Sequence, residues 1–217
     1  MVGKDVELIE YSKKVDFWNC ITHAAGSAFG IFAFIMLLVN AEDSRRMLSA
    51  VIYGISLVAV YTVSAVYHGL PQGELKRKAR LVDHCTVPVL IAGTATPCAL
   101  LTLYEINSVI GIAVLVFAWI CAFFGIFSKL FFFEKLKAVT VTVYIIAGII
   151  MLMSVIPVFD DINKIAFGEI VAGCICYLAG AVFCWLGIKI HYLHAVFHIF
   201  VLMGSVFHFY SVYAYMF

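Results

Sequence analysis

The amino-acid sequence predicts an all-α integral membrane protein, a bundle of seven transmembrane helices. Hydrophobic residues make up 65% of the 217 positions and charged residues only 12%, whereas soluble domains contain about half and a quarter. The apolar residues occur in long runs, each close to the roughly 20 residues that a helix needs to cross a bilayer. Seven runs with short connections use almost the whole chain, so residues 1–217 are expected to form one transmembrane domain.

Short polar connections, such as residues 40–46 and 71–78, separate the seven expected spans. The length of the runs favours helices over barrel strands, which would alternate in polarity over about ten residues. The first run follows a polar start and has no convincing cleavage site, so we interpret it as a retained span and not as a signal peptide. The runs extend over about 17–39, 48–70, 81–103, 109–130, 138–157, 165–187 and 190–215.

Two of these spans carry glycines at regular spacing. The first contains Gly26 and Gly30 in a GxxxG pattern, and the sixth contains Gly173, Gly180 and Gly187 at every seventh position. Small residues at such spacing let neighbouring helices approach closely. We therefore interpret both series as packing ridges.

The charged residues predict the orientation in the membrane. Of the 14 Lys and Arg residues, 11 lie at the N-terminus and in the second, fourth and sixth connections, and 3 lie on the opposite side. Positively charged loops stay in the cytoplasm. The N-terminus is therefore expected inside and the C-terminus outside, in a multi-pass protein of the cell membrane, which in a bacterium is the inner membrane.

Charge and cysteine content exclude two other classes of function. The net charge of +1 and the absence of a basic face give no reason to expect nucleic-acid binding. The seven cysteines are odd in number, contain no CxxC pair and fall mostly in apolar runs. They are interpreted as buried packing residues, not as a disulfide framework or a thiolate metal site.

Ionisable residues converge at the inner ends of three spans. His68 ends the second span, with Ser64 one turn deeper, and Asp83 begins the third. The seventh span starts on the same side and carries His194 and His198 in its first turns. Because ionisable groups inside spans are costly, their presence at one depth indicates a functional site.

The spacing of His194 and His198 is typical of zinc-binding helices. Residues i and i+4 lie on one helix face, as in HExxH, although the glutamate of that motif is absent here. Catalytic zinc takes three protein ligands and leaves one position for water. His68 is the best third ligand by depth, with His191 as its strongest rival, and Asp83 would then orient or deprotonate the water.

Simpler interpretations exist for each of these residues. Asp83 could cap the third helix, and Ser64 could bond to its own backbone. His23 could support the site from the first span. His84 is more simply a boundary residue, as is His208, which lies too far along the seventh span to reach the group.

Five segments, in order along nearly the whole chain, together resemble the haemolysin III family. This family is the bacterial branch of the progestin and adipoQ receptor family and is more distantly similar to alkaline ceramidases. The resemblance implies that His68, His194 and His198 bind zinc, that Asp83 contacts the zinc-bound water, that Ser64 belongs to the same site, and that the N-terminus is inside. The segments are Asn19–Gly26, Ser64–His68, Asp83–His84, Ile91–Pro97 and His194–Ser205.

The expected function is hydrolysis of a lipid amide or ester by a zinc-dependent intramembrane enzyme. The expected ligand is accordingly a membrane lipid or fatty acyl chain, while protein partners are not predicted. One alternative is a lipid sensor or regulator with a structural zinc. A cytolytic protein ranks last, because a pore needs polar residues along its whole length.

Overall fold

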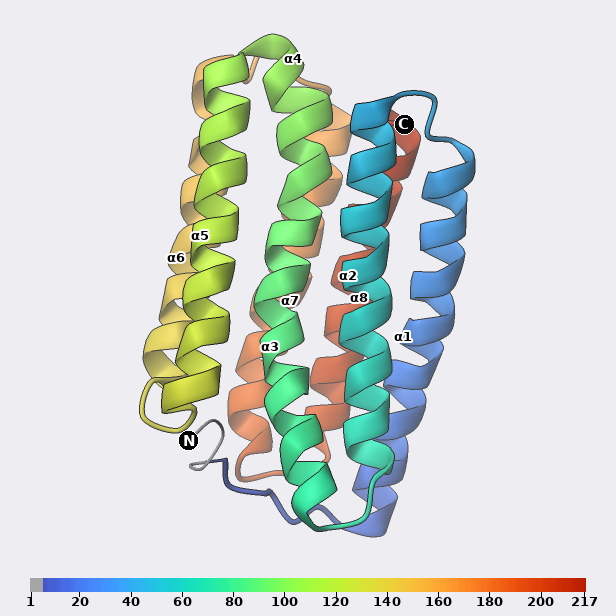
Figure 1. Ribbon diagram of the computed structural model, residues 1–217, viewed down its shortest axis with the longest axis vertical. Coiled ribbons are helices and arrows are strands. Elements are labelled where there is room, and N and C mark those ends of the chain that lie inside the picture. The colour runs from blue at the N-terminus through green and yellow to red at the C-terminus, as the bar shows by residue number, and fades with distance from the viewer. Residues whose placement is uncertain (1–5) are drawn as a thin grey trace.

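The computed structural model describes residues 6–217, and its helices run side by side along one long axis (Figure 1). Seven of the described helical segments are long and apolar enough to cross a membrane, which confirms the predicted fold class. α3, a π-helical stretch and the short α4 follow one another directly as a single span. The elements are α1 (Lys13–Val39), α2 (Ser44–Gly69), α3 (Glu74–Pro97), the π-helix (Cys98–Leu103), α4 (Tyr104–Ile106), α5 (Ser108–Phe132), α6 (Lys137–Met153), a 3-10 turn (Ile156–Val158), α7 (Lys164–Gly187) and α8 (Leu193–Tyr215).

The odd number of spans places the start of α1 and the end of α8 at opposite ends of the bundle (Figure 1). The lower end in Figure 1, where α1, α3 and α8 begin and α2 finishes, is called the N-terminal end below. The upper end is called the C-terminal end. Which side of the membrane each end faces stays a prediction from the charge distribution.

Several helices begin or end away from the limits of the predicted apolar runs, because hydrogen bonding and not hydrophobicity determines where a helix begins. α1 begins at Lys13, several residues before its apolar run, since the Ser12 hydroxyl caps it by accepting a bond from a backbone N–H at 3.3 Å. α3 likewise begins at Glu74 and not near 81. α8 starts later than expected, at Leu193, after a series of turns.

The fifth candidate span extends from Lys137 to Val158, close to the predicted run 138–157, but it is not one continuous helix, and proline is the physical reason. α6 ends at Met153, and Pro157 lies in the separate 3-10 turn, since the residue before a proline is disfavoured in the α conformation. Pro88 and Pro97, by contrast, lie inside α3. Pro97 is followed directly by the π-helix.

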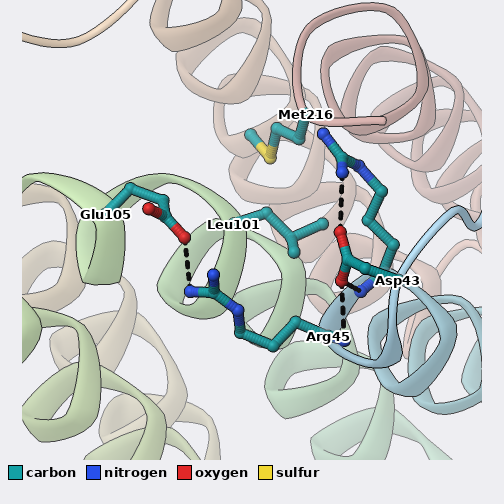
Figure 2. A pocket seen from close by; sticks show the side chains of 6 residues that line it. Asp43, Arg45, Leu101, Glu105 and Met216 are labelled. Carbon is teal, nitrogen blue, oxygen red and sulfur yellow. Dashed lines mark hydrogen bonds and ion pairs between the residues drawn. The ribbon is translucent and has the colours of Figure 1, made fainter.

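At the C-terminal end, both arginines of the first loop are paired with carboxylates (Figure 2). Asp43 caps α2 by accepting bonds from the backbone N–H groups of Arg45 and Arg46 at 2.8 and 2.9 Å. These bonds, that of Arg46 first, lower the pKa of the Asp43 carboxyl. Arg45 forms an ion pair with Glu105 and lies over the ring of Tyr104, so it links α2 to α4.

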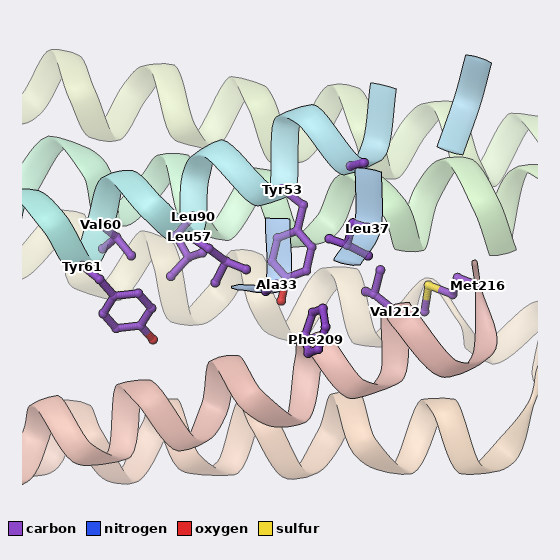
Figure 3. Packing of buried hydrophobic residues seen from close by; sticks show 11 residues of the cluster. Ala33, Leu37, Tyr53, Leu57, Val60, Tyr61, Leu90, Phe209, Val212 and Met216 are labelled. Carbon is purple, nitrogen blue, oxygen red and sulfur yellow. The ribbon is translucent and has the colours of Figure 1, made fainter. Parts of the chain in front are cut away.

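The main hydrophobic core lies between α1, α2, α3 and α8 (Figure 3). Tyr53 and Tyr61 of α2 are fully buried there, and the Tyr61 hydroxyl donates to Ser205 of α8 at 2.6 Å. This bond joins two of the helices that also carry the histidines described below. The buried members are Ala33, Leu37, Ala50, Tyr53, Leu57, Val60, Tyr61, Leu90, Phe209, Val212 and Met216.

The glycine series confirm the predicted packing ridges. A Cβ on Gly30 would lie 3.1 Å from backbone atoms of Leu57 and Val58, so α1 and α2 are in close backbone contact. A Cβ on Gly187 would lie 3.1 Å from the backbone nitrogen of His194, which places α7 directly against the start of α8. The glycine ridge of α7 therefore packs against the first turn of α8, which carries His194.

Candidate metal centre

Three histidines from two helices come together at the N-terminal end of the bundle. His68 lies in the last turn of α2, while His194 and His198 occupy successive turns at the start of α8. One ring nitrogen of each lies within 4.8 Å of the corresponding nitrogens of the others. His68 and His198 are buried, at 2% and 1% exposure. The arrangement follows from the antiparallel course of α2 and α8, which brings the end of one to the start of the other.

A carboxylate and an amide from α1 face the Nδ1 atom of His68. Nδ1 of His68 lies 3.1 Å from Oδ1 of Asp16 and 3.4 Å from the side-chain nitrogen of Asn19. A neutral imidazole that donates its Nδ1–H to Asp16 keeps a lone pair on Nε2. Among the described residues, Nε2 is buried and has no hydrogen-bond partner, so it is available as a metal ligand.

The backbone of α1 orients His198 in the same way. Nδ1 of His198 lies 3.2 Å from the carbonyl oxygen of Asn19, to which it donates, and 3.2 Å from the Thr22 hydroxyl oxygen. Nε2 of this ring consequently keeps its lone pair. Asn19 is completely buried, so both of these rings are held by α1, although α1 contributes no ring nitrogen to the group.

A buried ion network lies behind the histidines. Lys76 of α3 is only 1% exposed, and its ammonium donates to Oδ2 of Asp16 at 2.8 Å and to the carbonyl of Leu70 at 3.1 Å. It also lies over the ring of Tyr67. Asp16 thus connects α1, α2 and α3 through one carboxylate that contacts both Lys76 and His68.

Two further aromatic side chains cover the group. His23 of α1 stacks on His198 with ring centroids 3.6 Å apart and planes 18° apart. Tyr11, from the segment before α1, contacts the rings of His68, His191 and His194 at 5.8, 5.3 and 5.5 Å between centroids. Burial raises the pKa of the Tyr11 phenol. Tyr11 therefore packs against three histidine rings at this end of the bundle.

Besides the three histidines, the sequence predicted Asp83 and Ser64 as residues of the site. Asp83 lies well inside α3, because that helix starts at Glu74, so the interpretation of Asp83 as a helix cap was wrong. Its carboxylate is not among the grouped ligand atoms, but its side chain interacts with Ser64 of α2 and with Arg80. Ser64 is buried. The catalytic roles expected for Asp83 and Ser64 stay predictions.

The remaining histidines lie outside the group. His191, the predicted rival for the third ligand, precedes α8 and is not among the grouped ligands of the described residues. His84 packs its ring against Phe133 at 4.8 Å. His208 lies far along α8 and bonds to the carbonyl of Ile170 at 2.9 Å, as its interpretation as a non-ligand requires.

Sequence reasoning expected a supporting role for His23, but it missed Asp16 and Asn19 of α1 and Tyr11 before it. Asp16, Asn19 and His23 are spaced i, i+3 and i+7, which places them on one face of a helix. That spacing, at the inner end of the first span, is the signal that could have identified them. Lys76 gave no such signal, because it lies among several exposed basic residues and only the fold shows it to be buried.

The donor set fits zinc. Zinc binds imidazole nitrogen, and catalytic sites commonly use three protein ligands. A metal-bound histidine usually donates its other ring N–H to a carboxylate or backbone carbonyl, and His68 and His198 have these two partners. The seven cysteines in the described residues are free thiols and none joins the group.

Comparisons with known proteins cover nearly the whole chain. A family model described as Haemolysin-III related matches residues 11–209. Hemolysin-3 of Bacillus cereus is 30% identical over 215 residues, which cover 98% of this chain and 96% of that protein. The Hemolysin-3 homolog of Bacillus subtilis (strain 168) is 31% identical over 198 residues, or 90% and 91% of the two chains. Monocyte to macrophage differentiation factor of Homo sapiens is 27% identical over 206 residues, or 92% and 83%.

Proposed function

The chain belongs to the haemolysin III-related family and is a multi-pass membrane protein, and from this premise we propose that it is a zinc-dependent hydrolase of lipid amide or ester bonds. The observation that carries the proposal is the group of His68, His194 and His198, of which His68 and His198 are buried. Buried polar groups that only stabilise a fold are normally hydrogen-bonded. Nε2 of His68 has no such partner among the described residues, so a bound metal is the better explanation.

In this proposal each of the three histidines holds the zinc through one ring nitrogen. Bound zinc supplies Lewis acidity, which lowers the pKa of a water molecule toward neutrality and polarises a substrate carbonyl. Asp16 and the Asn19 carbonyl hold the His68 and His198 rings in the tautomer that ligation requires. In other metal sites with histidine ligands, such outer hydrogen-bond partners tune the metal affinity.

Asp83 is proposed to accept the proton of the attacking water. It is an ionisable residue within a span and is not needed as a cap. Ser64 interacts with Asp83 and lies on α2 one turn from His68, so it would fix the carboxylate relative to the histidine group. Its hydroxyl is also a donor for the oxyanion that forms during hydrolysis of a carbonyl.

The proposed substrate is a lipid because of the surroundings of the site. The outer faces of α5, α6 and α7 expose many large apolar side chains, such as Phe123, Ile149 and Trp185, which suit contact with acyl chains. The histidines lie at one end of the spans, at the level where a lipid's amide or ester group would meet the bilayer interface. The membrane itself is proposed to be the cell membrane, in a bacterium the inner one.

Zinc content of purified variants tests the metal site. Replacing His68, His194 or His198 with alanine should remove tightly bound zinc, because each supplies one of three ligands. His208→Ala is the matched control, since His208 is also buried but lies outside the group, and it should keep the metal. Loss of zinc from a His191→Ala variant, with retention in His68→Ala, would transfer the third ligand to His191.

Asp83→Asn separates hydrolysis from zinc binding. The neutral amide cannot accept a proton, and loss of a general base lowers rates about 10²–10⁴-fold, while the three histidines still hold the zinc. The measurement is turnover of ceramide-like amides and acyl esters, with zinc determined on the same samples. Undiminished turnover by a zinc-loaded Asp83→Asn variant would exclude Asp83 as the base.

A lipid sensor with a structural zinc is the second candidate, favoured by the way the site joins helices. The histidines and Asp16 connect α1, α2, α3 and α8, as a metal staple would. In that case zinc removal lowers thermal stability, and no member of the substrate panel is turned over. The relatives named hemolysin suggest cytolytic activity as a third, but the core around Leu37, Leu57 and Val212 is apolar and closely packed, unlike a pore.

A further inference from the structure

Two cationic side chains are buried beside one another at the N-terminal end of the bundle, outside the histidine group. Arg80 of α3 is 8% exposed and Lys129 of α5 is 5% exposed. Both lie over the ring of Phe133, with centroid distances of 5.1 Å from the guanidinium carbon and 5.0 Å from the ammonium nitrogen. One aromatic ring therefore contacts both cations.

The carboxylates of the described residues balance these charges only in part: Asp83 and Glu134 interact with Arg80, and Glu134 interacts electrostatically with Lys129. The only carboxylate oxygen within 4.0 Å of Arg80 belongs to Glu134, at 3.6 Å, too far for a hydrogen bond. Nη1 of Arg80 is buried and makes no hydrogen bond to the described residues. Glu134 also forms an ion pair with the exposed Lys137, with 2.9 Å between its Oε2 and the Lys137 Nζ. Within residues 6–217, no carboxylate oxygen lies within 4.0 Å of the Lys129 ammonium.

Two buried and incompletely paired cations favour the binding of an anion. A buried charge is costly unless it is paired and hydrogen-bonded, and contact with one aromatic ring compensates a cation only in part. Arginine provides several N–H donors in a planar fork that matches phosphate oxygens, and lysine adds a point charge. The two side chains together offer the donors that a phosphate group requires.

The surroundings of the two cations indicate that the phosphate belongs to a lipid. On α5, Phe127 and Phe131 flank Lys129 in sequence and are 54% and 48% exposed on the outside of the bundle. Val82 of α3, two residues after Arg80, is 49% exposed. Basic pockets between membrane helices bind anionic lipid head groups, and these apolar side chains provide a surface for the acyl chains.

We propose that Arg80 and Lys129 form a binding site for the phosphate of an anionic lipid head group, at the interface between α3 and α5. The site is separate from the zinc ligands and does not depend on hydrolytic activity. Its occupant adds negative charge and hydrogen-bond acceptors to the partial compensation that Asp83 and Glu134 provide. A phosphate ion from solution has the same chemistry, so the test distinguishes the two sources.

The full-length protein is to be reconstituted in nanodiscs of phosphatidylcholine alone or mixed with phosphatidylglycerol, and bound lipid identified by native mass spectrometry. The parent protein should retain phosphatidylglycerol over phosphatidylcholine, and Arg80→Gln with Lys129→Gln should reduce this preference about tenfold or more. Lys78→Gln and Lys135→Gln remove exposed cations nearby and should leave it unchanged. Equal retention of both lipids by the parent protein overturns the proposal without any variant.

Thermal unfolding provides a second measurement that a purely structural role would not reproduce. The parent protein should unfold at a higher temperature with phosphatidylglycerol than without it, whereas the double variant should be insensitive to the lipid. In phosphatidylcholine alone the double variant should be at least as stable as the parent, because incompletely compensated buried charges have been removed. Equal destabilisation of the double variant in both lipid mixtures overturns the proposal. Protection of the parent by inorganic phosphate alone, as strong as that by phosphatidylglycerol, supports the site and assigns it to free phosphate.

Discussion

Asp16 links the metal site to the stability of the fold, and combined changes at Asp16 and Lys76 can separate the two effects. Its carboxylate contacts His68 at 3.1 Å and Lys76 at 2.8 Å, and the side chains of these partners are 0% and 1% exposed. Asp16→Asn keeps the size of the side chain and one acceptor oxygen but removes the charge. The variant leaves Lys76 without its only ion pair among the described residues.

The magnitude of the stability loss follows from this geometry. Removing one partner of a fully buried ion pair costs about 3–5 kcal/mol. The Asp16 side chain is 18% exposed, and the amide oxygen can still accept a hydrogen bond, so we expect about 2–3 kcal/mol here. Loss of an outer partner of a metal-binding histidine lowers metal affinity about 10–100-fold, and the same reduction in zinc affinity is expected for Asp16→Asn.

A compensating variant separates these two effects. Adding Lys76→Met to Asp16→Asn removes the unpaired cation, and replacing both partners of a buried pair is close to neutral. Stability of the metal-free protein should then recover, while zinc affinity stays low because His68 has still lost its carboxylate. Asp43→Asn serves as the control, since Asp43 caps α2 at the other end of the bundle and asparagine is an equally good cap.

The assay combines chelator competition for zinc affinity with thermal unfolding of the metal-free and zinc-loaded proteins. Unchanged zinc affinity in Asp16→Asn would refute the idea that Asp16 orients a metal ligand. Recovery of zinc affinity together with stability in the double variant would show that the metal effect was only a consequence of misfolding.

Three further outcomes are expected. Reporter fusions should place the N-terminus in the cytoplasm and the C-terminus outside, and equal cytoplasmic signals would reject seven spans. Gly111→Ala should lower thermal stability by about 1–3 kcal/mol, because its Cβ would lie 2.6 Å from the Tyr104 backbone nitrogen, whereas Gly148→Ala, with open space around it, should be neutral or stabilising. Tyr11→Ala should speed removal of zinc by a chelator, since Tyr11 covers the histidines; an unchanged rate would exclude a covering role.

Much of the site could be predicted because the depth of a residue in the membrane follows from its position along the sequence. Each span crosses the bilayer once, so a residue's distance from the end of its apolar run gives its level, and this reasoning correctly grouped His68 with His194 and His198. Depth does not give the direction of a side chain around the helix axis. It therefore could not show that the Asp83 carboxylate lies outside the grouped ligand atoms or that His23 stacks on His198.

The sequence alone determined the number of spans, the family resemblance and the three histidines that meet, because hydrophobic length and helical spacing are local properties. Only the tertiary structure revealed that Asp16 of α1 holds His68 and pairs with Lys76, and that Arg80 and Lys129 are buried together over one ring. These contacts join residues of different helices. They depend on the rotation and mutual packing of whole helices, which the periodicity of a single helix does not encode.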